Sequence, residues 1–466
     1  MQSSHAPSAI EARFDDPNLV AAAGLVPTVA LAHRLGLADL TREHVKINTE
    51  GGASPHLKVT AIVAGMVAGA DSIDDLDVLR HGGMDRLFDG VRAPSTLGTF
   101  LRSVTFGHVR QLDAVATRFL TGLAVHTPLL PGADQIAFVD VDDTVRRTYG
   151  YQKQGAGHGY SGVKGLNALV ATVSTPAAAP VITATRLRKG STASARGASR
   201  LVADGLTSAR AAGATGLVVL RADSAFYNHA VIAAASRQRA SFSITARMDP
   251  AVTRAVASIP DHAWVPIRYP NAIFDQDEQR WISDAEVAET TYTAFTSRRL
   301  GEQVTARLVV RRVKRLNPNG DRGQGELFDT YRHHAVFTDS PMTMLQVEAQ
   351  HRGHAIIEGV IADLKNGPLA HLPSGKFNAN AAWLVLAAIA FNLTRAAGAL
   401  ASVFHARATT ATIRAHLINV PARIARSARR LVLHLPPNWP WEHPWQQLHD
   451  RATQPARPPA RTGPTR

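Results

Sequence analysis

Residues 136–144 read IAFVDVDDT, and at this stretch the sequence changes from helical to strand-like character. β-branched and aromatic residues alternate here with aspartate, a pattern that indicates a β-strand. Because side chains point alternately to the two faces of a strand, Phe138, Asp140 and Asp142 share one face. Carboxylates that end an apolar strand are costly to desolvate unless they bind a cation or hydrogen-bond donors. The stretch therefore predicts either a cation site or an aspartate-rich turn.

The segments that follow predict a sheet with helices. Residues 216–223, GLVVLRAD, form a continuous apolar run, as a strand covered on both faces should. Further strands are predicted at 166–175, 181–187 and 241–247, and helices at 195–212 and 227–237. The predicted order is β-β-β-α-β-α-β, which places this part of the chain in the α/β class.

Five regions are expected along the whole chain. Residues 20–130 have helical character, residues 250–340 hold short strands between polar turns, and helices return after residue 344. The predicted regions are a helical N-terminal DNA-binding domain (1–130), the first part of the α/β core (131–249), an inserted β-rich subdomain (250–340), the last part of the core (341–400) and a basic C-terminal region with a disordered tail (401–466).

The charge of the chain favours a polyanionic partner. The net charge is +14, and residues 401–466 contribute ten arginines against Glu442 and Asp450. An excess of this size attracts polyanions, of which nucleic acid is the usual one. The alternative is a genome rich in G and C, which raises the arginine content of any protein.

The absence of cysteine narrows the chemistry. Disulfides, thiolate zinc sites and cysteine nucleophiles are excluded, and we expect a cytoplasmic protein. The start of the chain shows no basic segment followed by an apolar one, so no signal peptide is expected. The most apolar run, residues 381–391 (AAWLVLAAIAF), is too short to span a bilayer and predicts a buried helix without a membrane role.

Asp223 follows the apolar run 216–222 directly. The carboxyl ends of strands are where open α/β sheets bind ligands, which makes Asp223 a candidate site residue. The alternative is that Asp223 caps the helix that begins near Ala225.

Residues 351–365 read HRGHAIIEGVIADLK and predict a helix with one polar stripe. Its period of 3.6 residues brings His351, His354, Glu358 and Lys365 onto one side, and the apolar residues pack on the other. Two histidines and a glutamate suggest zinc, but the spacing differs from HExxH, in which the general-base glutamate lies between the histidines. A solvated face with pairs of charges is the other alternative.

Taken together, these stretches resemble the DDE transposases of bacterial insertion sequences. The resemblance rests on DVDDTV (140–145), LRADSAFY (220–227), HRGHAIIEGVIADLK (351–365) and the segment 367–398, and it runs from about residue 20 to about residue 445. It implies a ribonuclease H-like mixed sheet flanked by helices. It fits best the branch with a β-rich insertion between the second aspartate and the glutamate.

The resemblance also implies a catalytic triad and its cofactor. Asp142, Asp223 and Glu358 match the two aspartates and the glutamate, with Asp140 as the alternative first ligand. These carboxylates would hold two Mg²⁺ ions, for which Mn²⁺ substitutes. Asp142 would bridge both ions, and Asp223 and Glu358 would hold one each. Two such ions activate the attacking oxygen and stabilise the leaving oxygen of a phosphodiester.

Basic residues near the glutamate are expected to contact DNA. Relatives carry Tyr-x2-Arg-x3-Glu-x6-Lys, and here His351 and His354 stand at the Tyr and Arg positions, while Glu358 and Lys365 agree. Histidine is a weaker phosphate clamp than arginine, so Arg352 is a candidate to compensate. Surface charge is the alternative for the remaining candidates of a phosphate track: Lys164, Arg186, Arg188 and Lys189.

The implied function is metal-dependent cleavage at the ends of a transposable element, followed by strand transfer into target DNA. The expected partners are double-stranded DNA with terminal inverted repeats and a second copy of the chain. The alternatives are a DNA-binding protein without catalysis and a nuclease without strand transfer. Of the tryptophans, Trp264 and Trp281 are expected in the core or stacked on an unpaired base, and Trp439 and Trp441 are expected to dock the tail.

Overall fold

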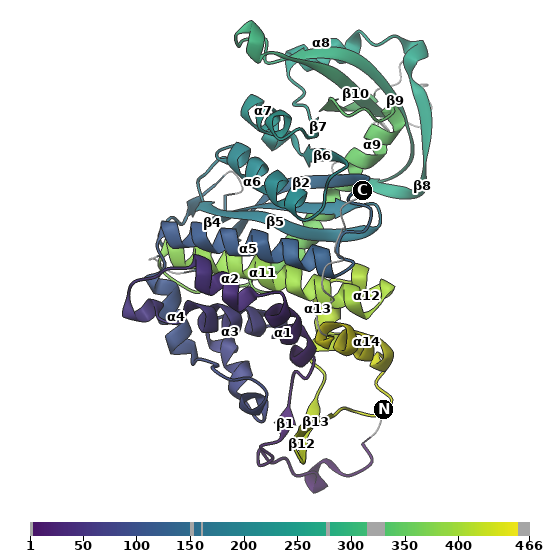
Figure 1. The fold of residues 1–466 in the computed structure, drawn as a ribbon. Helices are drawn as coiled ribbons and strands as arrows, with labels where there is room; N and C mark the ends of the chain where they lie inside the picture. Colours follow the sequence, from purple (N-terminus) through teal and green to yellow (C-terminus); the bar gives the residue numbers. More distant parts are fainter. Residues whose placement is uncertain (1–2, 150–152, 160–161, 276–279, 315–330, 455–466) are drawn as a thin grey trace, which may run out of the picture.

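The structure is a computed structural model that describes residues 3–149, 153–159, 162–275, 280–314 and 331–454. Within these residues, ten strands form one mixed sheet in the order β3-β4-β2-β6-β7-β11-β10-β9-β8, and β5 pairs with β4. Helices cover both faces of the first half of this sheet (Figure 1). A small second sheet, β1-β12-β13, lies at the opposite end of the molecule from β8–β10.

Five strands of the large sheet form the α/β core. Across the sheet these five strands lie in the order β5-β4-β2-β6-β7, and only β4 runs antiparallel to the others. This is the ribonuclease H-like arrangement, so the fold prediction is confirmed. The strands are β2 (Ile136–Arg147), β4 (Lys164–Thr175), β5 (Ala178–Lys189), β6 (Leu217–Ala222) and β7 (Ser241–Thr245); the two-residue β3 (Gly157–His158) pairs with β4.

The long strand β2 is the axis of the candidate site. It pairs with β4 along nearly its whole length, but with the shorter β6 only as far as Val141 opposite Ala222. The next residues along these two parallel strands are Asp142 and Asp223. Because β6 ends there, the second half of β2 has a neighbour on one side only.

Residues 250–340, the segment expected as an inserted β-rich subdomain, carry strands that extend the central sheet beyond β7. β11 pairs antiparallel with β7, from Val336 opposite Thr245 to Thr338 opposite Ser243. Backbone hydrogen bonds between β11 and β7 therefore join the strands of residues 250–340, called the added strands below, to the central sheet. These strands are β8 (Val265–Asp275), β9 (Arg280–Ala294), β10 (Val304–Lys314) and β11 (Tyr331–Thr338), and α8 (Pro250–Ala257) precedes them.

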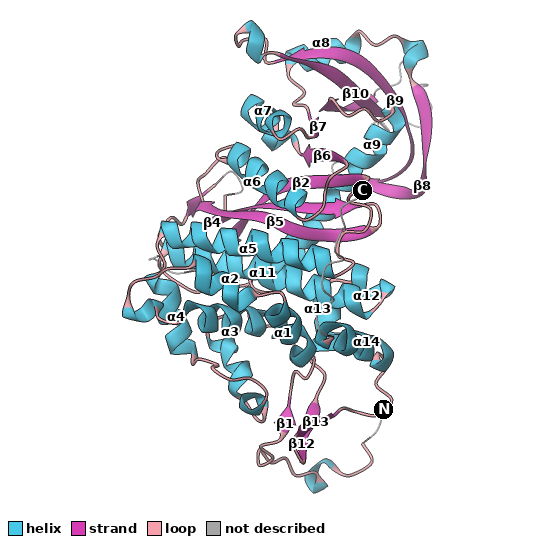
Figure 2. Cartoon of the chain, viewed as in Figure 1, coloured by secondary structure: helices cyan, strands magenta, loops and turns pink. Residues whose placement is uncertain are grey.

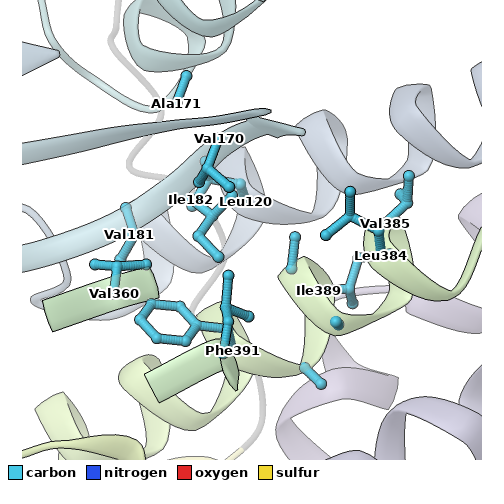
Figure 3. Packing of buried hydrophobic residues seen from close by; sticks show 14 of the residues in the cluster. Leu120, Val170, Ala171, Val181, Ile182, Val360, Leu384, Val385, Ile389 and Phe391 are labelled. Atoms are coloured by element: carbon cyan, nitrogen blue, oxygen red, sulfur yellow. The ribbon is translucent and has the colours of Figure 1, made fainter. Parts of the chain in front are cut away.

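Helix α11 (Phe377–Ala401) is the centre of the helical layer (Figure 2). It packs on β5 with one side and on the N-terminal helices with the other. Leu384 and Ile389 of α11 lie among Val360, Val181 and Leu120 from three other elements (Figure 3). The N-terminal helices thus share one core with the sheet and have no separate one. They are α1 (Leu25–Arg34), α2 (Leu37–His44), α3 (Pro55–Ala68), α4 (Pro94–Ser103) and α5 (Phe106–His126).

The apolar run 381–391 belongs to this helix, which is longer than the sequence indicated. Among the described residues α11 is the one helix long and apolar enough to cross a membrane, and 94% of its most apolar window is buried inside the molecule. It is therefore placed as a core helix. The remaining helices of the α/β core are α6 (Ala198–Ala211), α7 (His229–Arg237), α9 (Met344–Arg352) and α10 (Ile356–Lys365).

The C-terminal region folds back onto the helical layer. Trp439 donates its indole N–H to the carbonyl of His416 at 3.0 Å, and Trp441 stacks on the His416 ring, which is the docking role expected for these tryptophans. The tail predicted to be disordered lies, from residue 455 on, outside the described residues. The elements of this region are α12 (Val403–Arg407), α13 (Thr410–Ile413) with a π-helical turn (Arg414–Ile418), β12 (Ala422–Ser427), β13 (Arg430–His434) and α14 (Glu442–Thr453); β1 (Leu19–Val20) pairs with β12.

Candidate active site

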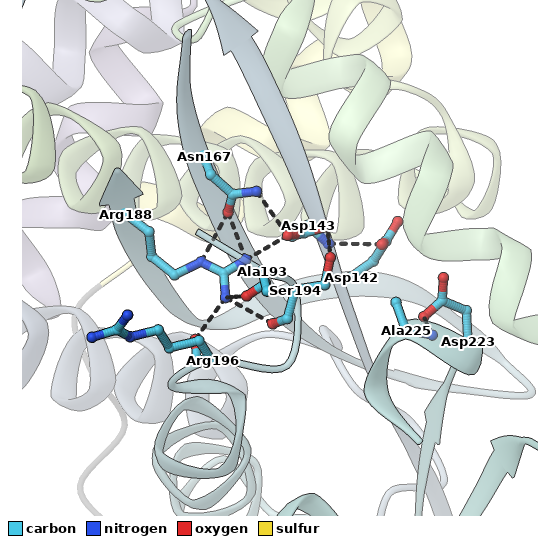
Figure 4. Close-up of polar contacts among 9 residues, drawn as sticks. All are labelled: Asp142, Asp143, Asn167, Arg188, Ala193, Ser194, Arg196, Asp223 and Ala225. Carbon is cyan, nitrogen blue, oxygen red and sulfur yellow. Dashed lines mark hydrogen bonds and ion pairs between the residues drawn. The ribbon is translucent and has the colours of Figure 1, made fainter. Parts of the chain in front are cut away.

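Two of the predicted carboxylates, Asp142 and Asp223, lie next to each other (Figure 4). They follow the last paired residues of β2 and β6, so the parallel register alone brings them together. Asp142 accepts a hydrogen bond from the backbone N–H of Asp143 at 2.7 Å, and Asp223 accepts one from Ala225 at 3.0 Å. Asp223 thus does cap a short helical turn, but its carboxylate makes no ion pair with a lysine or arginine among the described residues.

The surroundings of these two carboxylates disfavour negative charge. Burial raises the pKa of Asp142 to about 6, and the neighbouring charge of Asp223 raises it as well. Desolvation by the surrounding protein also raises the pKa of Asp223. Neither carboxylate forms an ion pair with a lysine or arginine among the described residues, and the neighbouring His354 offsets their repulsion only in part, so a bound cation would relieve the remainder.

Asp140, the alternative first ligand, is occupied by protein side chains. It is fully buried, and Arg221 of β6 donates two hydrogen bonds to its carboxylate at 2.8 and 2.7 Å. His354 Nδ1 lies 2.9 Å from the same carboxylate. Arg221 and His354 together hold the pKa of Asp140 below its usual value against the opposing effect of burial. Asp140 therefore has its charge balanced inside the protein, whereas Asp142 does not.

Asp143 points to the opposite face of β2 and is balanced in the same way. The Arg188 guanidinium forms an ion pair with it, and Asn167 Nδ2 donates to it at 2.7 Å (Figure 4). Arg188 also donates to the backbone carbonyl of Ser194 at 2.7 Å and is only 7% exposed. This buried network explains why three aspartates can stand within four residues of one strand.

Glu358, the third predicted carboxylate, lies in the first turn of α10. This helix packs on β2 through a buried side that includes Val360 and Ile361, and Glu358 is exposed on the other side. It makes no hydrogen bond or ion pair with any described residue. Glu358 follows His354 by one helical turn, so the contact between His354 and Asp140 also limits where Glu358 can lie.

The described residues contain no group of three or more His, Asp or Glu side chains already close enough to hold a metal ion. The pair Asp142–Asp223 is preformed, and Glu358 stands apart from it on α10. Carboxylate oxygens without cation partners are the ligands that Mg²⁺ prefers, so the residue types fit this ion. The same result gives the zinc interpretation of His351, His354 and Glu358 no support.

His351 does not have the phosphate-contact role that we expected. Its ring lies between two hydroxyls of β7, with Nδ1 3.0 Å from Ser243 Oγ and Nε2 2.9 Å from Thr245 Oγ1. Burial lowers the pKa of His351 to about 3, so the ring is neutral at physiological pH. Both nitrogens are used in holding α9 against β7, and no positive charge is available for DNA.

His351 should make the fold sensitive to acid. Because its pKa is lower in the folded than in the unfolded chain, its contribution to stability is complete above about pH 6.5 and is lost as the pH falls towards 3. Between pH 7 and 4.5 this residue alone should reduce the free energy of unfolding by about 2–3 kcal/mol. Urea unfolding of the wild type and His351→Gln at both pH values measures it. An equal pH dependence of the two proteins would contradict the buried, neutral state of His351.

The remaining basic candidates, Arg352, His354 and Lys365, differ in whether protein contacts already engage them. Arg352 donates to Glu348 at 2.7 Å and lies over the Tyr269 ring, so it is not free to compensate for the histidines. His354 is 15% exposed, and its charge lowers the pKa of both Asp142 and Asp223, which places it beside the carboxylate pair. Lys365 ends α10, about 10 Å along the helix axis from Glu358, and has no ion-pair partner among the described residues.

The predicted phosphate track along β4 and β5 is not supported. Arg188 is buried with Asp143, and Arg186 pairs with Asp204 at 2.9 Å, so both have structural roles. Lys164 is exposed, but it lies six residues along β4 from Val170, the partner of Asp142, which is about 20 Å away.

The two tryptophans of the added strands differ in environment. Trp264 is 8% exposed and packs against the Arg312 guanidinium, so it belongs to the core. Trp281 of β9 is 67% exposed. Neither residue lies in contact with the carboxylate pair in any described interaction.

Sequence reasoning missed Arg221 and gave Arg188 a phosphate-contact role, whereas both arginines pair with aspartates of β2. Arg221 interrupts the apolar strand β6 one residue before its end, and Arg188 stands near the end of β5. A charged residue inside a buried strand requires a partner of opposite charge, and the aspartates of residues 140–143 were the nearest candidates in the predicted sheet. That requirement was the signal available in the sequence.

Comparison with known families agrees with this geometry. A family model described as "Transposase DDE domain group 1" matches residues 2–456. A comparison with curated proteins gives no significant match. The family model covers nearly the entire chain, including all the strands and helices that carry Asp142, Asp223 and Glu358. The chain therefore belongs to the DDE transposase family, whose members act on DNA.

Proposed function

We propose that this transposase cuts DNA at the ends of its element and joins the freed 3′ ends to target DNA, with Asp142, Asp223 and Glu358 as metal ligands. The observation that carries the proposal is a contrast between neighbouring carboxylates. Asp140 and Asp143 are each neutralised by an arginine, whereas the three proposed ligands have no cation partner among the described residues. Two neighbouring, largely buried carboxylates without a basic partner at the ends of two strands are the groups that a bound cation stabilises.

The chain would hold two Mg²⁺ ions, or Mn²⁺ in their place, through these carboxylates. Such ions supply an activated oxygen nucleophile and stabilise the leaving 3′ oxygen of the phosphodiester. The protein's own contribution is positioning. Arg221 and Asp140 fix His354 beside the carboxylate pair, and Lys365 offers an unpaired positive charge at the far end of α10 for a phosphate next to the cut.

Glu358 is the part of the site that has to approach the pair. Its side chain has three rotatable bonds and starts from an exposed helical turn, and no hydrogen bond or ion pair with the described residues holds it in place. We propose that cation binding draws Glu358 to Asp142 and Asp223 and so completes the site on the α10 face of β2. We further propose that the protein works as a homodimer on two element ends in the bacterial cytoplasm, at the nucleoid.

Metal dependence tests the proposal directly. The wild-type protein is incubated with supercoiled DNA that carries the cognate inverted repeats, with Mg²⁺, with Mn²⁺ or with EDTA. We expect cleavage with either ion and none with EDTA, because the carboxylates alone do not activate water. Labelled element ends added with a target plasmid then report joining. DNA binding without cleavage under every ionic condition would favour the DNA-binding alternative, and cleavage without joining would favour the nuclease.

A further inference from the structure

The hairpin formed by β12 and β13 projects at the end of the molecule away from the candidate active site (Figure 1). Its strands pair from Arg423 opposite His434 to Ser427 opposite Arg430. Two residues, Ala428 and Arg429, make the turn, and Ala428 has the positive φ of 53° that such a tight turn requires. The element is a two-stranded ribbon with a narrow tip.

The base of this ribbon is fixed to the body of the protein. Ala422 and Ile424 are buried, at 5% and 3% exposure. The Ile424 N–H donates to the carbonyl of Asn18 at 2.9 Å, and Arg423 pairs with Asp16 at 3.0 Å. The tip is therefore held at a defined place by its base and does not depend on a flexible linker.

The tip carries three arginines on different sides. Arg426 continues the face of Ile424, Arg430 lies opposite Ser427 on the other face, and Arg429 is in the turn. All three are exposed, and none forms an ion pair with any described residue, in contrast to Arg423 at the base. Three like charges on a narrow ribbon repel one another unless a polyanion approaches.

We propose that the tip of the β12–β13 hairpin enters the major groove of double-stranded DNA and contacts its two backbones through Arg426, Arg429 and Arg430. The major groove, about 12 Å wide, admits a two-stranded ribbon. Charges on both faces of the ribbon suit the two phosphate walls of a groove, whereas a flat anionic surface would meet only one face. This inference rests on the proposed function only in taking DNA as the substrate, and it adds a contact remote from the cleavage site.

The dependence of DNA binding on salt tests the inference. Affinity for a duplex is measured without divalent ions, over a series of salt concentrations, for the wild type and R426Q/R429Q/R430Q. Each lost phosphate contact should reduce the slope of log K against log salt by about 0.9, so the triple variant should lose roughly 2.7. The matched control removes three exposed arginines that have acidic partners nearby, R42Q/R80Q/R298Q, and should leave the slope nearly unchanged.

Each result bears on the inference separately from the proposed function. An unchanged slope in the hairpin variant, or an equal fall in both triple variants, overturns the inference, as does equally tight hairpin-dependent binding to vesicles of anionic lipid. Cleavage at saturating protein should be retained by the hairpin variant, because the carboxylates are untouched. A wild type that shows the hairpin-dependent slope but never cleaves would support the hairpin contact and refute the proposed catalysis. Equal thermal unfolding midpoints confirm that both variants are folded.

Discussion

Asp142→Asn should abolish metal-dependent cleavage and at the same time stabilise the metal-free protein. Loss of an outer partner of a metal ligand commonly costs 10–100-fold, so loss of the ligand itself should reduce the cleavage rate by more than ~100-fold. Asp223→Asn should have the same effect on cleavage, because both carboxylates serve one site. The measurement is the single-turnover rate on element-end DNA in Mg²⁺.

The stability change follows from the pKa of Asp142, which burial raises to about 6. A carboxyl group whose pKa is raised in the folded state favours folding when it is protonated, and the fold loses stability as the pH rises from about 4 through 6. At pH 7 the charged Asp142 therefore opposes folding by on the order of 1–3 kcal/mol, which the neutral amide removes. Thermal unfolding in EDTA at pH 7 should show a higher midpoint for the variant.

Asp134→Asn is the matched control. Asp134 is exposed, lies just before the other end of β2, and makes no hydrogen bond or ion pair with a described residue. It should change neither the rate nor the midpoint. If Asp142→Asn cleaves DNA at the wild-type rate, the site as we place it is wrong, whatever the effect on stability.

Asp140→Ala should lower the stability of the protein, whereas Asp142→Asn should raise it. Arg221 is 4% exposed in its side chain, and the substitution would leave its guanidinium buried without a counter-charge. Removing one partner of a buried ion pair costs about 3–5 kcal/mol. His354 would lose its contact as well, so the start of α10 should loosen. Urea unfolding of the two proteins at pH 7 gives the difference in free energy.

Asp39→Ala provides the comparison for an ion pair at the surface. Asp39 and Arg42 are largely exposed, so breaking their pair should cost less than about 1 kcal/mol. The result for Asp140 also decides between the two possible first ligands. A stable Asp140→Ala protein without cleavage, beside an active Asp142→Asn, would make Asp140 the ligand and reverse our assignment.

The fold of the core was predictable because each of its strands carries its own pattern. The alternation in β2 and the continuous apolar run of β6 gave their positions to within three residues at either end. The added strands were harder to predict. β9 reads RWISDAEVAETTYTA, in which acidic residues and alanines weaken the strand pattern, and its pairing with β10 supplies what the local sequence lacks. No local pattern in β7 or β11 could show that they pair across 90 residues of chain.

The candidate site was predictable in its carboxylates but not in its cations. The patterns of β2, β6 and α10 made Asp142, Asp223 and Glu358 candidates, and the resemblance to DDE transposases selected them as a triad. Whether a histidine or arginine is free or occupied depends on contacts between distant segments. His351 is held by hydroxyls more than 100 residues away, and Arg188 is held by a carboxylate 45 residues away. Such contacts follow from packing and leave no periodic signal.

The central position of α11 has a consequence for how the protein is made. The apolar sides of α3 and α5 are covered by α11, which begins at Phe377, long after α3 ends at Ala68 and α5 ends at His126. Until then the nascent chain exposes these surfaces, and contacts this distant in sequence form slowly and favour aggregation. A product that ends at residue 376 keeps Asp142, Asp223 and Glu358 but lacks α11, the helix that joins the sheet to the N-terminal helices. Premature termination should thus yield insoluble chains, and soluble transposase should accumulate only from complete translation.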